Sequence, residues 1–417
     1  MPTLTRRNFL IASGGVGAAA VAAGATGVSW QQLMHSAATT PLPAGEQVLV
    51  VLTLYGGNDG LNTLIPYTDP AYHSARPDLA YTADEVQKLD GQFGLNPAMT
   101  GFAQLWQHKQ LAIVRGVGYP EPDHSHFRSM DIWQTAAPQS PSQTGWIGRW
   151  LDATGDDPLR AVNIGAVLPP LALGAKAAAA ALPLGNQRTA PKDLTTALLT
   201  LAQPDPSDGP SRAMVRGSVS ADHLVDTTFA RVLDPNAAGE QTDQQSAASS
   251  AGGQGSLSDQ LAVVARCIAA GVPTRVYSVS QGGFDTHADE KDAQKNALGL
   301  VDKAVQQFLT TIGKTSRARD VTLLMYSEFG RRVQANASQG TDHGTAGPVF
   351  VVGARVKGGY YGDQPSLTSL DNGDLHVTTD FRSVYAELLD KVLGADPHQI
   401  VGDPASFINR QDEISFL

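Results

Sequence analysis

The sequence has very little cysteine and few charged side chains. Cys267 is its single cysteine, which excludes an intramolecular disulfide and a thiolate metal cluster. Basic residues number 30 against 40 acidic ones, a net charge of −10, so the basic surface of a nucleic-acid-binding protein is absent. With 42% hydrophobic and 17% charged residues, the composition also excludes a disordered chain or a coiled coil. We therefore expect a globular protein that binds no nucleic acid and is stabilised by its core or by bound ions.

A long uninterrupted hydrophobic run is also missing. The weakly apolar stretch 11–28 contains five glycines, so it makes a poor spanning helix and predicts no stable membrane span in the mature protein. The stretch follows TRRNFL at residues 5–10, and Ser36-Ala37-Ala38 offers a small-residue cleavage site. We predict a twin-arginine signal peptide over residues 1–38, a twin-arginine translocase partner during export, and a periplasmic or secreted location. The alternative, an amphipathic first helix, lacks a polar face at helical spacing.

Buried strands alternate with helical patterns along the mature chain. Continuous apolar runs that end at glycine or polar residues indicate strands at 47–55, 111–115, 274–279, 320–326 and 348–353. Helical patterns occupy residues 96–107, 129–135, 258–270, 288–312 and 380–393. This alternation predicts an α/β fold, a doubly wound and mostly parallel sheet, in which ligands bind outside the carboxyl ends of the strands.

The predicted domain organisation is one α/β domain over residues 39–417 with an insertion at about 160–256. Residues 204–210 and 234–256 are rich in small and polar residues, proline and glycine, so 234–256 is expected to be loop or disorder. The role of residues 160–233 does not follow from the sequence.

Four clusters of ionisable residues follow the predicted strands. They are GGNDGLN at 56–62, DHSHFRS at 123–129, GGFDTHAD at 282–289, and SEFGRR at 327–332 together with TDHG at 341–344. Of only ten histidines in the chain, four lie in these clusters: His124, His126, His287 and His343. Because the carboxyl ends of parallel strands share one edge of a sheet, we expect the clusters to meet there.

Carboxylates and imidazoles without thiols predict a mixed oxygen and nitrogen site for one or two divalent ions, with Zn, Mn, Mg and Ca all open. Two ions about 4 Å apart would hold the attacking and leaving oxygens of a displacement at phosphorus or sulfur. Ser125, at a helix N-terminus, and Arg128, with its planar guanidinium, suit an anionic ester. The substrate class expected is thus an anionic ester, as a small molecule or a polymer.

Each cluster alone also has a structural interpretation. GGNDG is typical of a tight turn, and Asp285 with His287 of a helix cap. Glu328 with Arg331 is compatible with a surface pair, Ser125 with a cap, and His343 with a hydrogen-bonded loop. The occurrence of all four clusters at one expected sheet edge favours a functional site.

Together these motifs resemble the bacterial domain of unknown function 1501. The resemblance rests on the twin-arginine start, on GGNDGLN, GGFDTHAD and SEFGRR, and on SHFRSMDIWQT at 125–135, GWIGRWLD at 145–152 and TDHGTAGPVFVVG at 341–353, nearly the whole mature chain. That family is remotely similar to the alkaline phosphatase and sulfatase superfamily. This implies an α/β sheet, usually two metal ions, and a Ser, Thr or formylglycine nucleophile.

The resemblance also implies roles for single residues. Asn62 and Arg128 would bind the anion, and Ser125 or His126 occupies the nucleophile position. No cysteine is there to become formylglycine, which argues against a standard sulfatase mechanism. Glu328 replaces an aspartate, and Phe329 stands where a histidine is usual. The metal ligands implied are Asp59, Asp285, His287, Glu328, Asp342 and His343.

The function expected is an exported, metal-dependent hydrolase of phosphate or sulfate esters. The alternative is a non-catalytic periplasmic binding or assembly protein that retains the fold. A redox enzyme is disfavoured, because no GxGxxG follows the first strand and cysteine ligands are lacking.

Overall fold

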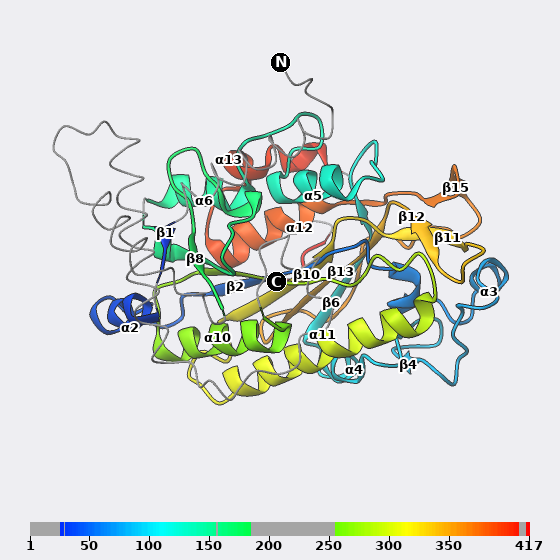
Figure 1. Ribbon diagram of the computed structural model, residues 1–417, viewed down its shortest axis with the longest axis horizontal. Helices are drawn as coiled ribbons and strands as arrows, with labels where there is room; N and C mark the ends of the chain where they lie inside the picture. Colours follow the sequence, from blue (N-terminus) through cyan, green and yellow to red (C-terminus); the bar gives the residue numbers. More distant parts are fainter. Residues whose placement is uncertain (1–25, 29, 156, 185–254, 408–413) are drawn as a thin grey trace, which may run out of the picture.

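A ten-stranded mixed sheet forms the centre of the protein (Figure 1). The computed structural model describes residues 26–28, 30–155, 157–184, 255–407 and 414–417. The predicted Arg6-Arg7 pair and all of the predicted loop 234–256 except residues 255–256 lie outside the described residues. The strand order is β1-β8-β7-β9-β2-β10-β13-β6-β14, with β17 also pairing with β6. The strands are β1 (Thr26–Gly27), β2 (Val48–Leu54), β6 (Leu111–Gly118), β7 (Ala161–Ile164), β8 (Ala180–Leu182), β9 (Val276–Gln281), β10 (Val321–Ser327), β13 (Gly347–Gly353), β14 (Gly359–Tyr361) and β17 (Thr379–Asp380).

The middle of the sheet is parallel, which confirms the predicted fold class. Strand β2 pairs in parallel with β10 on one side and with β9 on the other. Strand β13 is antiparallel to both β10 and β6, so β6 runs in the same direction as β10. All seven residues of β2 are buried, as expected for a strand covered on both faces.

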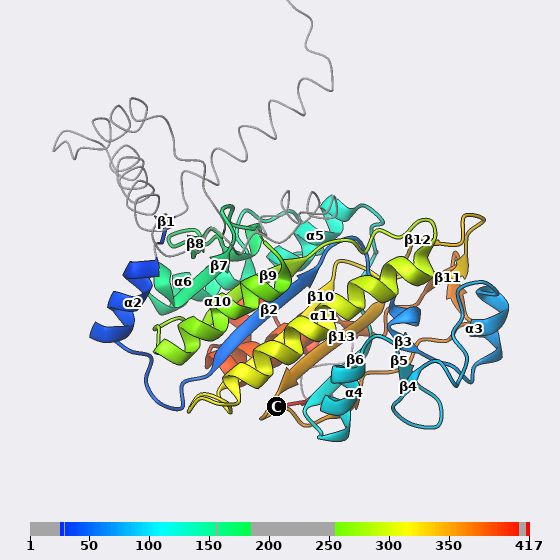
Figure 2. The same ribbon diagram turned by 60° about the horizontal axis from the view of Figure 1, so that its bottom comes forward.

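Two layers of helices cover the sheet (Figures 1 and 2). Side chains alternate along β2, so Val48, Val50 and Leu52 join the core under one layer, whereas Leu49 and Val51 join the core under the other. The first layer contains α2 (Trp30–Thr39), α4 (Thr100–Gln107), α10 (Leu257–Ala270) and α11 (Glu290–Ile312). The second contains α5 (His126–Thr135), α6 (Trp146–Thr154), α12 (Phe381–Leu388) and α13 (Pro397–Val401).

Local signals set the helix ends. Ser256 and Asp259 form a capping box at the start of α10, and Gly271 ends that helix in the left-handed conformation. Helix α4 begins four residues later than the pattern predicts. The side chain of Asn96 there holds a turn, donating to the Asn62 carbonyl and accepting from the Ala98 backbone N–H. Helix α12 continues into a π-helical turn over Leu389–Leu393.

Part of the predicted insertion belongs to the sheet. Strands β7 and β8 extend it beyond β9, although the sequence analysis assigns residues 160–184 to an insertion. Strand β1 pairs with β8, and Leu33 of α2 is buried in the core beside α10, although β1 and all of α2 except Thr39 belong to the predicted signal peptide. Cleavage after Ala38 therefore stays a prediction. No helix in the described segments combines the length and apolar character needed to cross a bilayer.

Small antiparallel elements lie beside the main sheet. A hairpin of β11 (Arg331–Ala335) and β12 (Thr341–His343) follows β10 and leads into β13. Helix α3 (Pro70–Ala75) packs against β11. The remaining short strands are β3 (Leu64–Ile65), β4 (Gln87–Lys88), β5 (Gly94–Leu95), β15 (Leu370–Asp371) and β16 (Asp374–Leu375). The β11–β12 hairpin brings residues 341–343 to the edge where β2, β9 and β10 end.

Candidate metal centre

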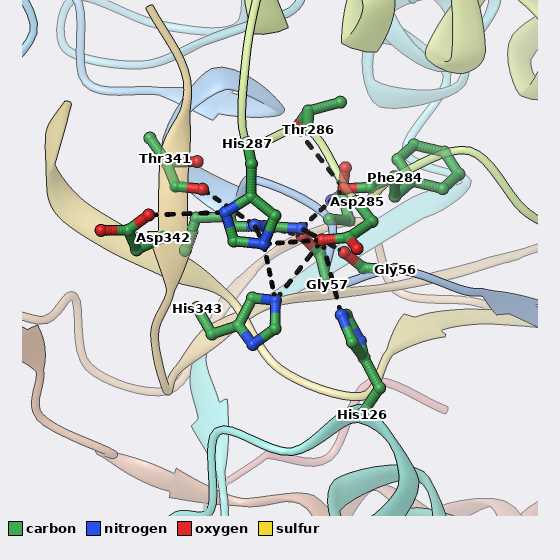
Figure 3. Close-up of polar contacts among 12 residues, drawn as sticks. Gly56, Gly57, His126, Phe284, Asp285, Thr286, His287, Thr341, Asp342 and His343 are labelled. Carbon is green, nitrogen blue, oxygen red and sulfur yellow. Dashed lines mark hydrogen bonds and ion pairs between the residues drawn. The ribbon is translucent and has the colours of Figure 1, made fainter. Parts of the chain in front are cut away.

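Three of the four predicted clusters contribute side chains to one group at this edge (Figure 3). Asp285 and His287 follow β9, His343 ends β12, and His126 begins α5. The three imidazoles point towards the carboxylate of Asp285 (Figure 3). We call His126, Asp285, His287 and His343 the Asp285 cluster.

Asp285 Oδ1 is the common contact of the cluster. His287 Nε2 lies 3.0 Å from this oxygen, and His126 Nε2 and His343 Nε2 each lie 3.4 Å from it. The Nε2 atoms of His287 and His343 are 2.9 Å apart. Nitrogen atoms from three histidines and one carboxylate oxygen therefore face a common point.

Two glycines after β2 allow the loops to approach this closely. A Cβ on Gly56 would lie 2.4 Å from the Asp285 backbone nitrogen, and one on Gly57 would lie 2.2 Å from the Phe329 ring. Both residues also have positive φ angles, 117° and 70°. The GGNDG motif is thus a turn, as one interpretation of the sequence predicts, and it is also what lets β2 and β9 bring their loops together.

The Arg331 guanidinium joins these loops. The side chain is buried, and it donates to the Gly57 carbonyl at 2.7 Å and to the Thr341 carbonyl at 2.8 Å. It also donates to Asp285 Oδ1 at 2.6 Å. Although burial of Asp285 opposes ionisation, this hydrogen bond and the charge of Arg331 lower the pKa of Asp285. The carboxylate at the centre of the cluster is therefore ionised at neutral pH.

His343 directs a lone pair towards the cluster. Its Nδ1 lies 2.7 Å from the backbone carbonyl of His124, and a carbonyl only accepts, so Nδ1 carries the proton. Burial lowers the pKa of His343, and the nearby charges of His126 and Arg331 act in the same direction. The neutral ring then has its lone pair on Nε2, facing the carboxylate with no proton between them.

His126 is oriented in the same way by a different partner. Its Nδ1 donates to Glu328 Oε1 at 2.8 Å, and its Nε2 is buried without a hydrogen bond to any described residue. Burial opposes protonation of His126, but the hydrogen bond and the charge of Glu328 outweigh it and raise the pKa. A buried nitrogen without a hydrogen bond, aimed at a carboxylate, is an arrangement that a cation would satisfy.

The donor set therefore fits a divalent metal ion. One ligand atom from each of His126, Asp285 and His343 lies within 4.8 Å of the others, and His287 adjoins them. Each of His126 and His343 has its other ring nitrogen held by an acceptor, which is the usual arrangement of metal-binding histidines. Of the four ions that the sequence leaves open, a set dominated by imidazole favours zinc over manganese, magnesium and calcium, which prefer oxygen ligands.

Two of the other residues implied as ligands lie next to the cluster. Glu328 Oε1 is occupied by His126 and by the Gly56 backbone N–H, and Oε2 accepts from Ser327, so Glu328 holds His126 in place. The Asp342 side chain is 60% exposed and lies 3.4 Å from His287 Nδ1. Both carboxylates thus contact the Nδ1 atom of an imidazole whose Nε2 atom faces Asp285.

Asp59, implied as the first metal ligand, lies in a different environment. Its fully buried carboxylate forms a two-point ion pair with the equally buried Arg76, and its Oδ1 also accepts from the Leu61 backbone N–H. Arg76 further donates to the Val333 and Arg332 carbonyls. Arg76 neutralises Asp59 directly, which leaves no reason for this carboxylate to bind a cation. We therefore omit Asp59 from the metal centre.

Three further predicted residues have other partners. The buried Asn62 accepts from Tyr72 and supports the loop before α3. Arg128 pairs with Asp131 on the same helix at 2.6 Å. Ser125 is exposed at the N-cap position of α5, with its backbone N–H donating to Asp123. The structure thus brings His126, Asp285, His287 and His343 together, with Glu328 and Asp342 beside them, whereas Asn62 has a structural role.

A pocket of about 540 Å³ that the sequence does not reveal adjoins the cluster. His126, Asp285 and Glu328 form one end, and α5, the loop after β7 and the residues Tyr55, Gly56 and Gly283 form the rest. The apolar run Val167-Leu168-Pro169-Pro170 is its sequence signal, but this run is informative only once β7 is known to be a strand of the sheet. The role of Arg331 in joining the loops is likewise visible only from its hydrogen-bond partners in the structure.

The chain belongs to the family of proteins of unknown function numbered 1501 (DUF1501), which matches residues 46–405. This confirms the family that the motifs predict. No curated protein matches the sequence.

Several solved structures are similar to the chain at low identity. A protein of the alkaline phosphatase superfamily from Vibrio parahaemolyticus is 13% identical, with a TM-score of 0.42, over 91% of this chain and 80% of that one. The lipoteichoic acid synthase LtaP from Listeria monocytogenes is 8% identical, with a TM-score of 0.33, over 91% and 80%. A magnesium-bound variant of TAB5 alkaline phosphatase is 9% identical, with a TM-score of 0.33, over 75% and 92%.

The buried carboxyl of Glu290, beside Asp59, predicts a pH-dependent stability. Burial and the charge of Asp59 raise the pKa of Glu290 to about 9, against roughly 4.3 for an exposed glutamate. Between these values the folded protein holds a proton that the unfolded chain has lost, so stability falls as pH rises. Urea denaturation of metal-free protein from pH 5 to 9 measures the free energy of unfolding. We expect it to fall less steeply with rising pH in Glu290→Gln than in the wild type. The difference between the two slopes is at most about 1.4 kcal/mol per pH unit.

The matched control is Glu121→Gln, a change at an exposed glutamate. Parallel profiles for the wild type and Glu290→Gln would show that Glu290 is ionised in the folded protein.

Proposed function

We propose that this protein is an exported, metal-dependent hydrolase of phosphate or sulfate esters. The observation that carries the proposal is the convergence of His126 Nε2, His287 Nε2 and His343 Nε2 on Asp285 Oδ1. The Nδ1 atoms of His126 and His343 are held by Glu328 and by the His124 carbonyl, so their Nε2 atoms face inwards. This geometry supports one ion held by His126, Asp285 and His343, with His287 as a further ligand.

The charges around the cluster explain why such a hydrolase would need the ion. Asp285, Glu328 and Asp342 surround it, and the guanidinium of Arg331 is already engaged with Asp285 and with backbone carbonyls. An anionic ester would be repelled by these carboxylates alone. A divalent ion, when bound, supplies the positive charge and polarises the phosphoryl or sulfuryl oxygen.

The chain's own groups have distinct roles in this proposal. His126 serves as a ligand, because its Nδ1 is held by Glu328 and its Nε2 faces the cluster. Ser125 stays the proposed nucleophile, since its side chain is exposed at the N-terminus of α5, directly before that ligand. The free backbone N–H groups of the first helical turn favour an anionic group at this position. Arg331 positions Asp285 and does not contact the ester.

The first test of the proposal is metal binding. We expect the purified protein to bind about one zinc ion per chain, as measured by elemental mass spectrometry and competition with a chromophoric chelator. His126→Ala and His343→Ala remove ligands and should abolish stoichiometric binding. Glu328→Gln disturbs only the orientation of His126 and should weaken the affinity by roughly 10- to 100-fold.

Two control variants accompany this test. His398→Ala removes a histidine that also lies near a carboxylate, Asp403 at 3.6 Å, but outside the cluster. Asp59→Asn keeps the shape of the buried pair with Arg76. Both should retain the metal. Loss of metal from Asp59→Asn with retention in His343→Ala would contradict the proposed ligand set.

The second test is hydrolysis of chromogenic esters. Metal-loaded protein should hydrolyse nitrophenyl phosphate, bis-nitrophenyl phosphate or nitrophenyl sulfate, and a chelator should stop the reaction until metal is restored. Ser125→Ala should lower kcat at least 100-fold, because a side-chain nucleophile makes its contribution in the chemical step. The control is Ser142→Ala, at a serine bonded to Thr144.

Two results would revise this proposal. Turnover that survives in Ser125→Ala would assign the attack to water. Stoichiometric metal without turnover of any ester would support the alternative, a non-catalytic binding or assembly protein that retains the fold.

Export by the twin-arginine translocase is proposed from residues 5–10 and is tested separately. Replacement of both Arg6 and Arg7 by lysine keeps the charge but removes the guanidinium pair that the pathway recognises. We expect the variant to stay in the cytoplasm in cell fractionation, whereas Thr3→Ala should still be exported. Normal export of the double lysine variant would exclude this route.

A further inference from the structure

The pocket beside the Asp285 cluster has two chemically different ends. His126, Asp285 and Glu328 form the polar end, where the proposed metal ion would lie. Phe127 and Met130 of α5 face the loop that follows β7, which contributes Val167 and Leu168. Its volume of about 540 Å³ is within the usual range for small-molecule sites. A ligand with its reactive group at the cluster would thus place the rest of its atoms against an apolar wall.

Exposed apolar side chains are concentrated at this pocket. Among the described residues, three large apolar side chains are strongly exposed: Phe127 at 91%, Leu300 at 51% and Val167 at 43%. Two of these three, Phe127 and Val167, line the pocket. Exposed apolar surface costs roughly 25 cal/mol per Å², so its concentration beside a polar cluster marks a binding surface.

The wall offers little to a polar or highly charged ligand. None of the described residues that line it is a lysine or an arginine. The amide of Gln134 is bonded to the Tyr55 hydroxyl at 3.0 Å, and Asp131 is paired with Arg128. The polar groups of the wall therefore already have partners, and the remaining surface is apolar. Recognition of a polyanionic chain along this wall would require cations that the lining lacks.

We propose that the pocket binds the apolar alkyl or aryl group of the ester whose charged end is held at the Asp285 cluster. This inference rests on the proposed function and adds the substrate class, an amphiphilic ester with one anionic head and one apolar group. The apolar group would be the part released as an alcohol or phenol. Phe127 and Val167 are then substrate-specificity residues, because in the free protein their exposure stabilises nothing.

The experiment measures binding rather than turnover. Isothermal titration calorimetry of the metal-loaded protein with n-alkyl phosphonates, from ethyl to hexyl, gives affinity against chain length. n-Alkyl alcohols of the same lengths provide a second series without a charged head. We expect affinity to rise roughly two- to fourfold per methylene in both series, since burial of a methylene contributes about 0.8 kcal/mol.

The variants locate this effect in the pocket. Phe127→Ser combined with Val167→Ser should reduce the gain from ethyl to hexyl phosphonate at least fivefold. Leu300→Ser changes an equally exposed leucine on α11, on the opposite face of the sheet, and should leave both series unchanged. These positions are exposed, so the substitutions are compatible with folding.

The two ideas fail in different ways. An affinity independent of chain length, or a rise with length that the double variant retains, overturns the apolar subsite and leaves the proposed hydrolase intact. If the phosphonates bind no more tightly than the alcohols but show the same dependence on chain length, the apolar subsite is supported. The same result would contradict the anion-binding metal centre that the proposed function requires.

Discussion

The arrangement of the candidate site depends on the side chain of Arg331. Its buried guanidinium donates to backbone carbonyls after β2 and in β12, and to the carboxylate of Asp285 after β9. A buried carbonyl oxygen without a donor costs about 1–3 kcal/mol. One cation with five donors satisfies several of them at once. Arg331 thereby holds the segments that contain Gly57, Asp285 and Thr341 in fixed positions relative to one another. His287 and His343 lie two residues after Asp285 and Thr341 and are positioned with them.

Two arginine–aspartate pairs near this edge have opposite consequences. The pair of Arg76 and Asp59 is fully buried, so the two charges neutralise each other and their remaining polar atoms bond to backbone groups. The pair of Arg331 and Asp285 has one buried partner, whereas the Asp285 side chain is 51% exposed. Asp285 is thus fixed in position and kept ionised while one side of its carboxylate still faces the imidazoles. The difference in burial, rather than in residue type, separates a structural aspartate from a candidate ligand.

The sequence predicted the parts of this site that local patterns encode. The apolar runs of β2, β6, β9 and β10, with the motifs that follow them, predict that His126, Asp285, His287 and His343 meet at one edge. The pairing of Asp59 could not be predicted from the sequence, because its partner, Arg76, lies 17 residues away beyond a short helix, and no motif links the two. Apart from Asp285, the partners of Arg331 named above are main-chain carbonyls, which have no sequence signature. Strands β7 and β8 span only four and three residues, two of the latter alanines, too short for a periodic signal.

Helix α5 connects the two ends of the pocket, so the contacts that anchor this helix determine how the two ends are placed relative to each other. Residues 126 and 130 are one turn apart, so the helix places an imidazole at the cluster and Met130 on the apolar wall. At the N-terminal end, Ser129 donates to the Asp123 carbonyl and bonds to Tyr119. Towards the C-terminal end, Trp133 stacks on Tyr326 of β10, at 4.9 Å between ring centroids. Because β10 also leads to Glu328, which holds His126, the polar and apolar ends are fixed to the same strand of the core.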